Sequence, residues 1–105
     1  MVYIIVPVFN RIEKTVKCLE SIYKQSFSEI IVIVVDDGST DNTRAVLESH
    51  FSKVVILNGN GSLFWTGAVK LGIEYVLNIC NKEDWILLMN NDVQVKNDTI
   101  EKLVS

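Results

Sequence analysis

A short apolar run over residues 30–35 stops abruptly at the polar segment 36–39, whose residues are Asp, Asp, Gly and Ser. Such a run, rich in β-branched residues and bounded by turn formers, is typical of a strand buried on both faces. Open α/β sheets bind ligands at the carboxyl ends of their strands. Two carboxylates and a glycine at this place therefore indicate a ligand site.

The rest of the chain repeats this alternation of apolar runs and amphipathic segments. Strands are expected over residues 2–8, 30–35, 54–57 and 85–89, and helices over 10–25, from 39 or 40 to 50, 66–81 and 97–104. Repeated β-α-β units with right-handed crossovers give a parallel sheet covered by helices. The pattern predicts an α/β fold, a three-layer α/β/α arrangement with a mainly parallel sheet, in one domain over residues 1–105.

Polar residues at the starts of the helical segments are expected to cap them. Asn10 with Glu13, and Asp98 with Glu101, have the spacing of a capping box, and Ser39 or Thr40 is expected to cap the second helix. The buried stripes are expected to be Ile12, Val16, Leu19 and Ile22 in the first helix, and Val69, Ile73, Val76, Leu77 and Cys80 in the third.

Composition and charge exclude several classes of protein. The net charge is −3 and the ten Lys and Arg residues are scattered, so nucleic acid is not expected as a partner. No apolar run approaches the roughly 20 residues that span a bilayer, and no leader is recognisable, which predicts a cytoplasmic protein or one peripheral to the membrane. Cys18 and Cys80 are expected as buried thiols, and His50 as a surface or capping residue.

A second strand end carries the same kind of polar residues, because the run over 85–89 is followed by Asn90, Asn91 and Asp92. All carboxyl ends of a parallel sheet lie at one edge, so both polar segments are expected in one crevice. Asp36 or Asp37 could accept hydrogen bonds from a base or ribose, and Asp92 offers an oxygen that hard cations prefer. Mg²⁺ or Mn²⁺ would then bridge Asp92 to phosphates. Each segment alone could equally be a turn before a helix.

Four motifs occur in the order found in one enzyme family. They are residues 5–11 (IVPVFNR), 34–41 (VVDDGSTD), 58–61 (NGNG) with 65–68 (WTGA), and 87–93 (LLMNNDV). Together they resemble the family 2 glycosyltransferases, and residues 65–68 resemble the rhamnosyltransferase-like branch. The resemblance covers the whole chain. It implies a GT-A fold that binds a nucleotide-diphosphate sugar.

The resemblance also implies roles for particular residues. The nucleotide-sugar-binding set would be Pro7, Val8, Phe9, Asn10, Asp36, Asp37, Gly38, Gly67, Asn90 and Asn91. Within it, Asp37 would read the base and Asp36 would support its loop. Asp92 matches the last residue of the D-x-D metal motif, whose first position is occupied here by Asn90. Trp65 would pack on the sugar or base, or else be a core aromatic residue.

The implied reaction is transfer of a sugar with inversion at its anomeric carbon. The base that deprotonates the acceptor lies downstream of D-x-D in the family, and only residues 93–105 follow here. The chain is therefore expected to be a donor-binding half, inactive or weakly active alone, and to self-associate through its last strand as an exposed sheet edge.

Other classes of protein remain as alternatives. A non-catalytic nucleotide-sugar-binding or regulatory module would use the same residues. A Rossmann dehydrogenase is disfavoured, because no G-x-G-x-x-G follows the first strand. A receiver domain is disfavoured because its acidic pair would follow the first strand rather than the second.

Overall fold

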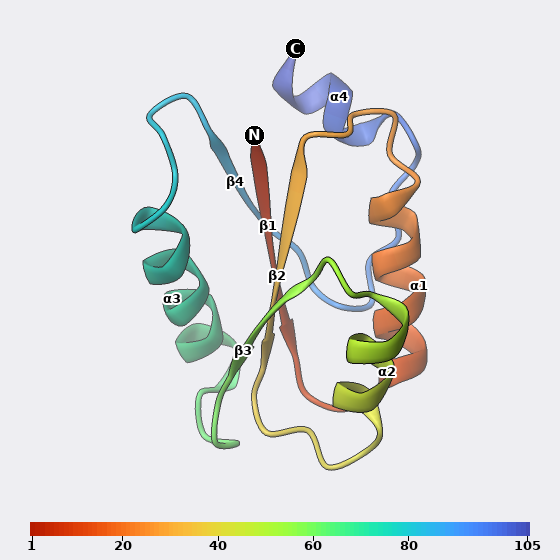
Figure 1. Cartoon of the computed structure of the whole chain (residues 1–105), viewed down its shortest axis with the longest axis vertical. Coiled ribbons are helices and arrows are strands. Elements are labelled where there is room, and N and C mark those ends of the chain that lie inside the picture. Colours follow the sequence, from red (N-terminus) through yellow and green to blue (C-terminus); the bar gives the residue numbers. More distant parts are fainter.

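The computed structural model describes all residues from 1 to 105, and strands alternate strictly with helices along the chain (Figure 1). The elements are β1 (Val2–Val8), α1 (Ile12–Tyr23), β2 (Ile30–Asp36), α2 (Thr43–His50), β3 (Val55–Asn58), α3 (Phe64–Leu77), β4 (Trp85–Leu88) and α4 (Thr99–Val104). The four strands form one sheet in the order β3-β2-β1-β4, and every pairing is parallel. The predicted α/β fold is confirmed.

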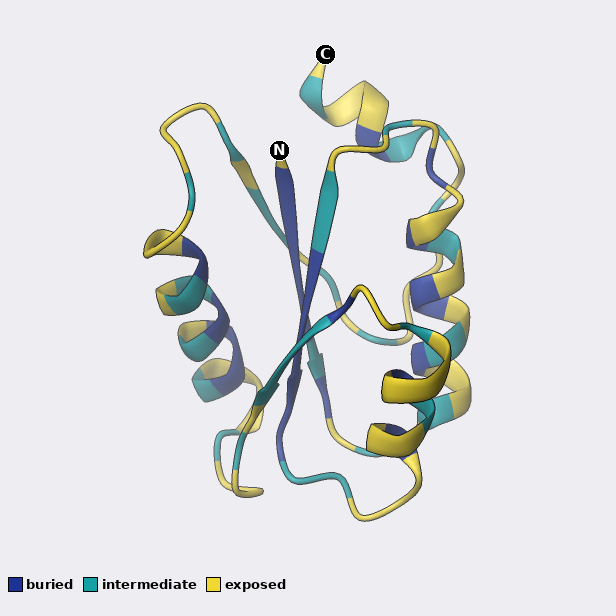
Figure 2. Ribbon diagram, viewed as in Figure 1, coloured by how far each residue is buried: buried dark blue, intermediate teal, exposed yellow.

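Helices cover both faces of the sheet, which gives the expected three layers. In Figure 1, α3 lies on one side of the strands and α1 and α2 lie on the other. Alternate residues of β1 point to opposite faces. Ile4 belongs to the core cluster that includes Leu19 of α1 and Leu47 of α2, whereas Ile5 belongs to the cluster that includes Ala68 of α3. Figure 2 shows the buried residues gathered on the strands and on the helix faces toward them.

The predicted helix starts were wrong by two to four residues. α1 begins at Ile12, and Asn10 does not cap it, because Asn10 and Arg11 both adopt left-handed backbone conformations with φ of 57° and 60°. α2 begins at Thr43, so neither Ser39 nor Thr40 caps it.

The last two helices also differ from their predictions. α3 begins at Phe64 and ends at Leu77. α4 begins at Thr99, and Asp98 makes no capping hydrogen bond but pairs with Lys102 at 2.9 Å. The predicted partner of Asp98, Glu101, instead accepts a hydrogen bond from Ser26.

The predicted helix stripes are buried only in part. Leu19, Ile22, Val69 and Val76 are buried, whereas Ile12, Val16 and Ile73 are half-buried. Leu77 is 63% exposed, because it lies at the end of α3. Cys80 is only half-buried, whereas Cys18 is fully buried as predicted. His50 is exposed in the last turn of α2, as expected. None of the helices is both long enough and apolar enough to cross a bilayer.

Candidate functional site

A cleft of about 380 Å³ opens at the carboxyl ends of β1 and β2, toward the lower edge of the sheet in Figure 1. The start of α3 and the loop after β4 complete its walls. The cleft is lined by Pro7, Val8, Phe9, Arg11, Asp37, Gly61, Phe64, Trp65, Ala68 and Asn91. Segments far apart in sequence therefore meet where a parallel α/β sheet ordinarily binds its ligand.

The structure brings half of the expected site residues to this cleft. Pro7, Val8, Phe9, Asp37, Trp65 and Asn91 line it, whereas Asn10, Asp36, Gly38, Gly67, Asn90 and Asp92 do not. Arg11, Gly61, Phe64 and Ala68 also line the cleft but were not in the expected binding set, although all of them except Phe64 lie within the four motifs. Arg11 and Phe64 could have been predicted as lining residues from their position, since each directly adjoins an expected site residue in the chain.

Asp37 holds together the loop on the far side of the cleft. Its Oδ1 accepts hydrogen bonds from the backbone N–H groups of Gly61 at 2.8 Å and Leu63 at 3.2 Å, and its Oδ2 accepts one from Phe64 at 2.9 Å. The residue is only 5% exposed. A carboxylate offers about four acceptor positions. One position, on Oδ2, is left for a ligand.

Two glycines allow the loops that carry these residues to touch. A Cβ on Gly38 would lie 2.8 Å from the backbone nitrogen of Gly61, and Gly38 has a φ of 73°. A Cβ on Gly59 would lie 2.5 Å from Oδ1 of Asp37. The loop after β2 and the loop after β3 therefore approach more closely than any residue with a side chain would permit.

Asp36 has no direct access to the cleft. It is 5% exposed, and its Oδ1 accepts a hydrogen bond from the N–H of Ser39 at 3.1 Å, which closes a turn after β2. The backbone oxygen of Asp36 also accepts from Gly59. Its position is that of a residue that supports the loop of Asp37.

Asn10 joins the loop after β1 to the loop after β2. Its Oδ1 accepts hydrogen bonds from the backbone N–H groups of Thr40 at 2.7 Å and Asp41 at 3.2 Å, and its own N–H donates to Oγ of Ser39 at 2.8 Å. Asparagine is among the residues that tolerate the left-handed region best. Asn10 is thus a connector between two strand ends rather than a helix cap.

The carboxylate of Asp41 lies near the start of α1, and its hydrogen bonds are to Thr43. Hydrogen bonds from the hydroxyl and backbone N–H of Thr43 lower the pKa of the Asp41 carboxyl group, and the nearby N–H groups of Ile12 and Arg11 lower it further. A carboxylate near the first turn of a helix is favourable for the helix dipole. An anionic group of the chain itself therefore lies close to the start of α1.

Trp65 and Asn90 close the side of the cleft toward β4. The indole Nε1 of Trp65 donates to Oδ1 of Asn90 at 3.0 Å, and the amide of Asn91 donates to Oγ1 of Thr15 in α1 at 3.1 Å. Trp65 is 54% exposed, so it is not a core aromatic residue. The amide oxygen of Asn90, at the first position of the D-x-D motif, therefore already accepts a hydrogen bond.

Asp92 is exposed and lies outside the lining of the cleft. Its negative charge acts on Cys18 of α1. Burial and, to a smaller extent, the Asp92 carboxylate raise the pKa of Cys18 to about 11. No group of three or more His, Cys, Asp or Glu side chains could hold a metal ion. One exposed carboxylate still fits Mg²⁺ or Mn²⁺, because such ions often take one or two carboxylates and complete their shell with phosphates and water.

The fold and the cleft define a parallel α/β domain with a cleft at the carboxyl ends of its strands, where such folds ordinarily bind ligands. The sequence model of "Glycosyl transferase family 2" matches residues 3–105. The chain therefore belongs to glycosyltransferase family 2.

Known relatives support this membership. Over 106 residues the chain is 30% identical to "Glycosyltransferase GlyG" of Streptococcus pneumoniae serotype 4, an alignment that covers 98% of this chain and 34% of GlyG. Over 52 residues it is 36% identical to "Chondroitin synthase" of Escherichia coli, with 50% of this chain and 8% of that protein covered. The chain thus spans about a third of the length of GlyG and less than a tenth of the length of chondroitin synthase.

Solved structures share the fold. S. aureus TarS 1–349 in complex with UDP superposes with a TM-score of 0.77 and 25% identity over 97% of this chain and 30% of that one. The mannosyltransferase PcManGT of Pyrobaculum calidifontis, in complex with GDP-Man and Mn²⁺, gives a TM-score of 0.73 at 22% identity over 89% of this chain and 28% of that one. These likenesses confirm a GT-A fold.

Proposed function

We propose that this chain is the donor-binding part of a glycosyltransferase, and that its cleft holds the nucleotide of a nucleotide-diphosphate sugar. The observation that carries the proposal is the cleft itself, where a buried carboxylate with one free acceptor position meets exposed aromatic side chains at the strand ends. Binding of UDP by TarS, which shares the fold, agrees with it.

Each wall of the cleft would contact a different part of the donor. The free acceptor position of Asp37 would take a hydrogen bond from an N–H of the base. Phe9 and Trp65, each 54% exposed, would stack on the base or the sugar ring. Asn91 would offer its amide oxygen, because its nitrogen already donates to Thr15.

We propose that Asp92 binds Mg²⁺ or Mn²⁺ only together with the donor. The ion would neutralise the charge that develops on the leaving diphosphate. Since Asn90 replaces an acid in the D-x-D motif and its oxygen accepts from Trp65, the chain itself offers one carboxylate. Metal affinity without nucleotide should therefore be weak.

The reaction we propose for the longer enzyme is displacement at the anomeric carbon with inversion. An acceptor hydroxyl must lose its proton to a general base. Asp37 is the only carboxylate that lines the cleft, and its oxygens are engaged by backbone N–H groups. We therefore propose that the general base lies outside this 105-residue chain. The same observation favours a second candidate, a nucleotide-sugar-binding module without catalysis.

Calorimetric titration of the 105-residue chain with UDP-, dTDP- and GDP-sugars, with and without Mn²⁺, tests the proposal. We expect one donor to bind, and Mn²⁺ to strengthen its binding. Asp92→Asn should remove the effect of Mn²⁺ while the metal-free affinity stays within about 2-fold, because an exposed side chain outside the cleft is replaced.

Asp98→Asn in α4 is the matched control and should retain the Mn²⁺ effect. Failure of every donor to bind would contradict the proposed function. Sugar transfer at an ordinary enzymatic rate by this chain would instead contradict the placement of the base outside it, and would exclude the non-catalytic candidate.

A further inference from the structure

The cleft contains one cationic side chain, that of Arg11. Arg11 is exposed, and its guanidinium takes part in none of the chain's ion pairs and none of its side-chain hydrogen bonds. The only carboxylate in the lining, Asp37, already accepts three backbone hydrogen bonds. The guanidinium is therefore free to bind an anion that enters the cleft.

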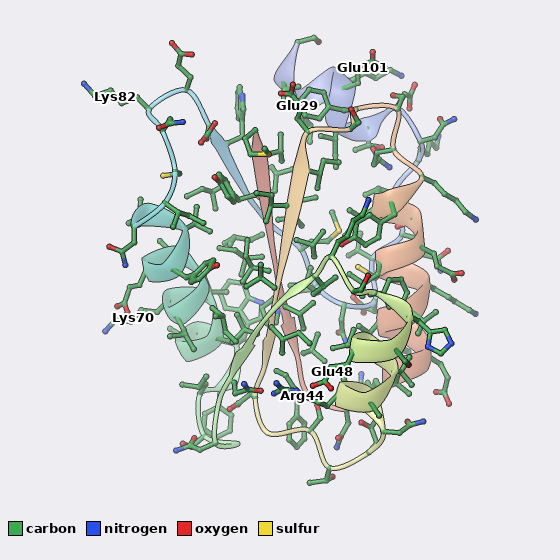
Figure 3. All side chains as sticks on the ribbon, in the orientation of Figure 1. Glu29, Arg44, Glu48, Lys70, Lys82 and Glu101 are labelled. Atoms are coloured by element: carbon green, nitrogen blue, oxygen red, sulfur yellow. The ribbon has the colours of Figure 1, made fainter.

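Arg44 of α2, in contrast, has a guanidinium that is engaged by other side chains of this protein. Its Nε lies 2.6 Å from Oε1 of Glu48, and its Nη1 donates to the amide oxygen of Asn58 at the end of β3. Figure 3 shows Arg44 and Glu48 beside one another. Arg44 is committed to holding α2 against β3, so it is not available to a ligand. Arg11 has no such partner.

The backbone around Arg11 is held in an uncommon conformation. Its φ of 60° and the φ of 57° at Asn10 place two consecutive side-chain-bearing residues in the left-handed region, which costs on the order of 1 kcal/mol per residue. Hydrogen bonds from Thr40 and Asp41 to Asn10 maintain this turn. Such strain persists only where the surroundings enforce it, and here it begins α1 with Arg11 at the wall of the cleft.

Backbone groups nearby offer little alternative for an anion. The start of α1 would ordinarily attract one, but the carboxylate of Asp41 lies close to it and repels a second anion. The start of α3 is occupied by Asp37 through the N–H of Phe64. A negatively charged group in this cleft is left with the guanidinium of Arg11 and with any metal ion that it brings.

We infer that Arg11 binds the diphosphate of the nucleotide through its guanidinium. The inference rests on the proposed function and deepens it, because it assigns the phosphate contact to a side chain that follows the first strand. A guanidinium matches phosphate oxygens with two parallel N–H donors. It also supplies positive charge to the diphosphate, which matters because a metal ion is held by one carboxylate fewer where Asn90 replaces an acid.

The test compares a nucleoside with its diphosphate in the absence of metal. Calorimetry of the 105-residue chain with uridine and UDP, thymidine and dTDP, and guanosine and GDP gives the gain in affinity that the phosphates provide. Arg11→Gln should lower affinity for the diphosphate about 10-fold or more, the range for a lost hydrogen bond to a charged group, and leave the nucleoside unchanged. Arg11→Lys should restore part of the loss, because it keeps the charge without the fork.

Lys17→Gln is the matched control, because it removes one exposed positive charge from α1, the helix that Arg11 precedes, outside the cleft. It should leave both affinities unchanged. Added salt should weaken UDP binding by the unmodified chain more than by Arg11→Gln. Equal diphosphate affinities for the unmodified chain and Arg11→Gln would overturn the inference and leave the proposed function standing. If the unmodified chain bound none of these diphosphates either with or without Mn²⁺, both would fall.

Discussion

Asp37 has two tasks that the sequence alone suggests only in part. Its motif indicates a base-reading carboxylate, but the folded chain also uses it to fix the loop of residues 59–63 and the start of α3. The partners lie 24 to 27 residues further along the chain. The local sequence pattern around Asp37 therefore could not predict these hydrogen-bond partners. A substitution at Asp37 will change both the shape of the cleft and its chemistry.

Asp37→Asn should destabilise the fold by about 1–3 kcal/mol, the cost of leaving a buried polar group without its partner. The amide oxygen can replace Oδ1, but the NH₂ group must then face the N–H of Phe64. Urea denaturation measures the loss. Asp92→Asn, an exposed acid at the same sheet edge, should stay within about 0.5 kcal/mol of the unmodified chain. Equal stability of the two variants would show that the hydrogen bonds of Asp37 contribute little.

At the scale of elements, the loops after β1 and β2 act as one unit because Asn10 connects them. Asn10→Ala removes the side-chain hydrogen bonds to Thr40 and Asp41 and places alanine at a φ of 57°. We expect a loss of about 2–3 kcal/mol, from the hydrogen bonds and the backbone strain together. Asn10→Gly loses the hydrogen bonds without the strain and should cost about 1 kcal/mol less.

Urea denaturation of both Asn10 variants, with UDP titration of each, checks this prediction. Since Arg11 follows directly, loosening the turn should also weaken diphosphate binding. If alanine and glycine at position 10 were as stable as asparagine, the connection between the two loops would be incidental to the fold.

The elements themselves could be predicted from sequence, but their ends could not. The apolar runs and stripes report burial against a sheet, so each strand and helix was found. The start of α1 was wrong because the contacts of Asn10 reach Thr40 and Asp41, about 30 residues away. The prediction that Leu77 is buried was wrong, because the apolar periodicity continues to the end of the helix, whereas burial ends where the sheet no longer lies beneath it.

The site was predictable to a similar extent. That Asp37 and Asn91 line one cleft follows from parallel strand order, which the alternation of elements implies. The exclusion of Asp92 from the lining does not follow, since it depends on how the chain turns after β4. Nor does the accessibility of Arg11, which depends on two left-handed residues that no helix propensity would predict.

At the scale of the whole molecule, β4 is the least protected element of the sheet. It pairs with β1 on one side only, at the end of the strand order. Trp85 and Leu88 are 48% and 46% exposed, and Figure 2 shows β4 without the continuous buried stretch of β1 and β2. An exposed apolar edge with unpaired backbone groups is a template for another strand.

We propose that the 105-residue chain self-associates through β4, with two copies pairing their edges about a twofold axis. Sedimentation velocity should show an average mass that rises with concentration. Leu88→Lys should weaken the association at least about 10-fold, because a charged side chain at a sheet edge opposes pairing. Leu103→Lys in α4, where the leucine is 54% exposed, is the control and should leave the association unchanged. A chain that stayed monomeric at every concentration would contradict this pairing, and equal effects of the two lysines would place the contact elsewhere on the surface.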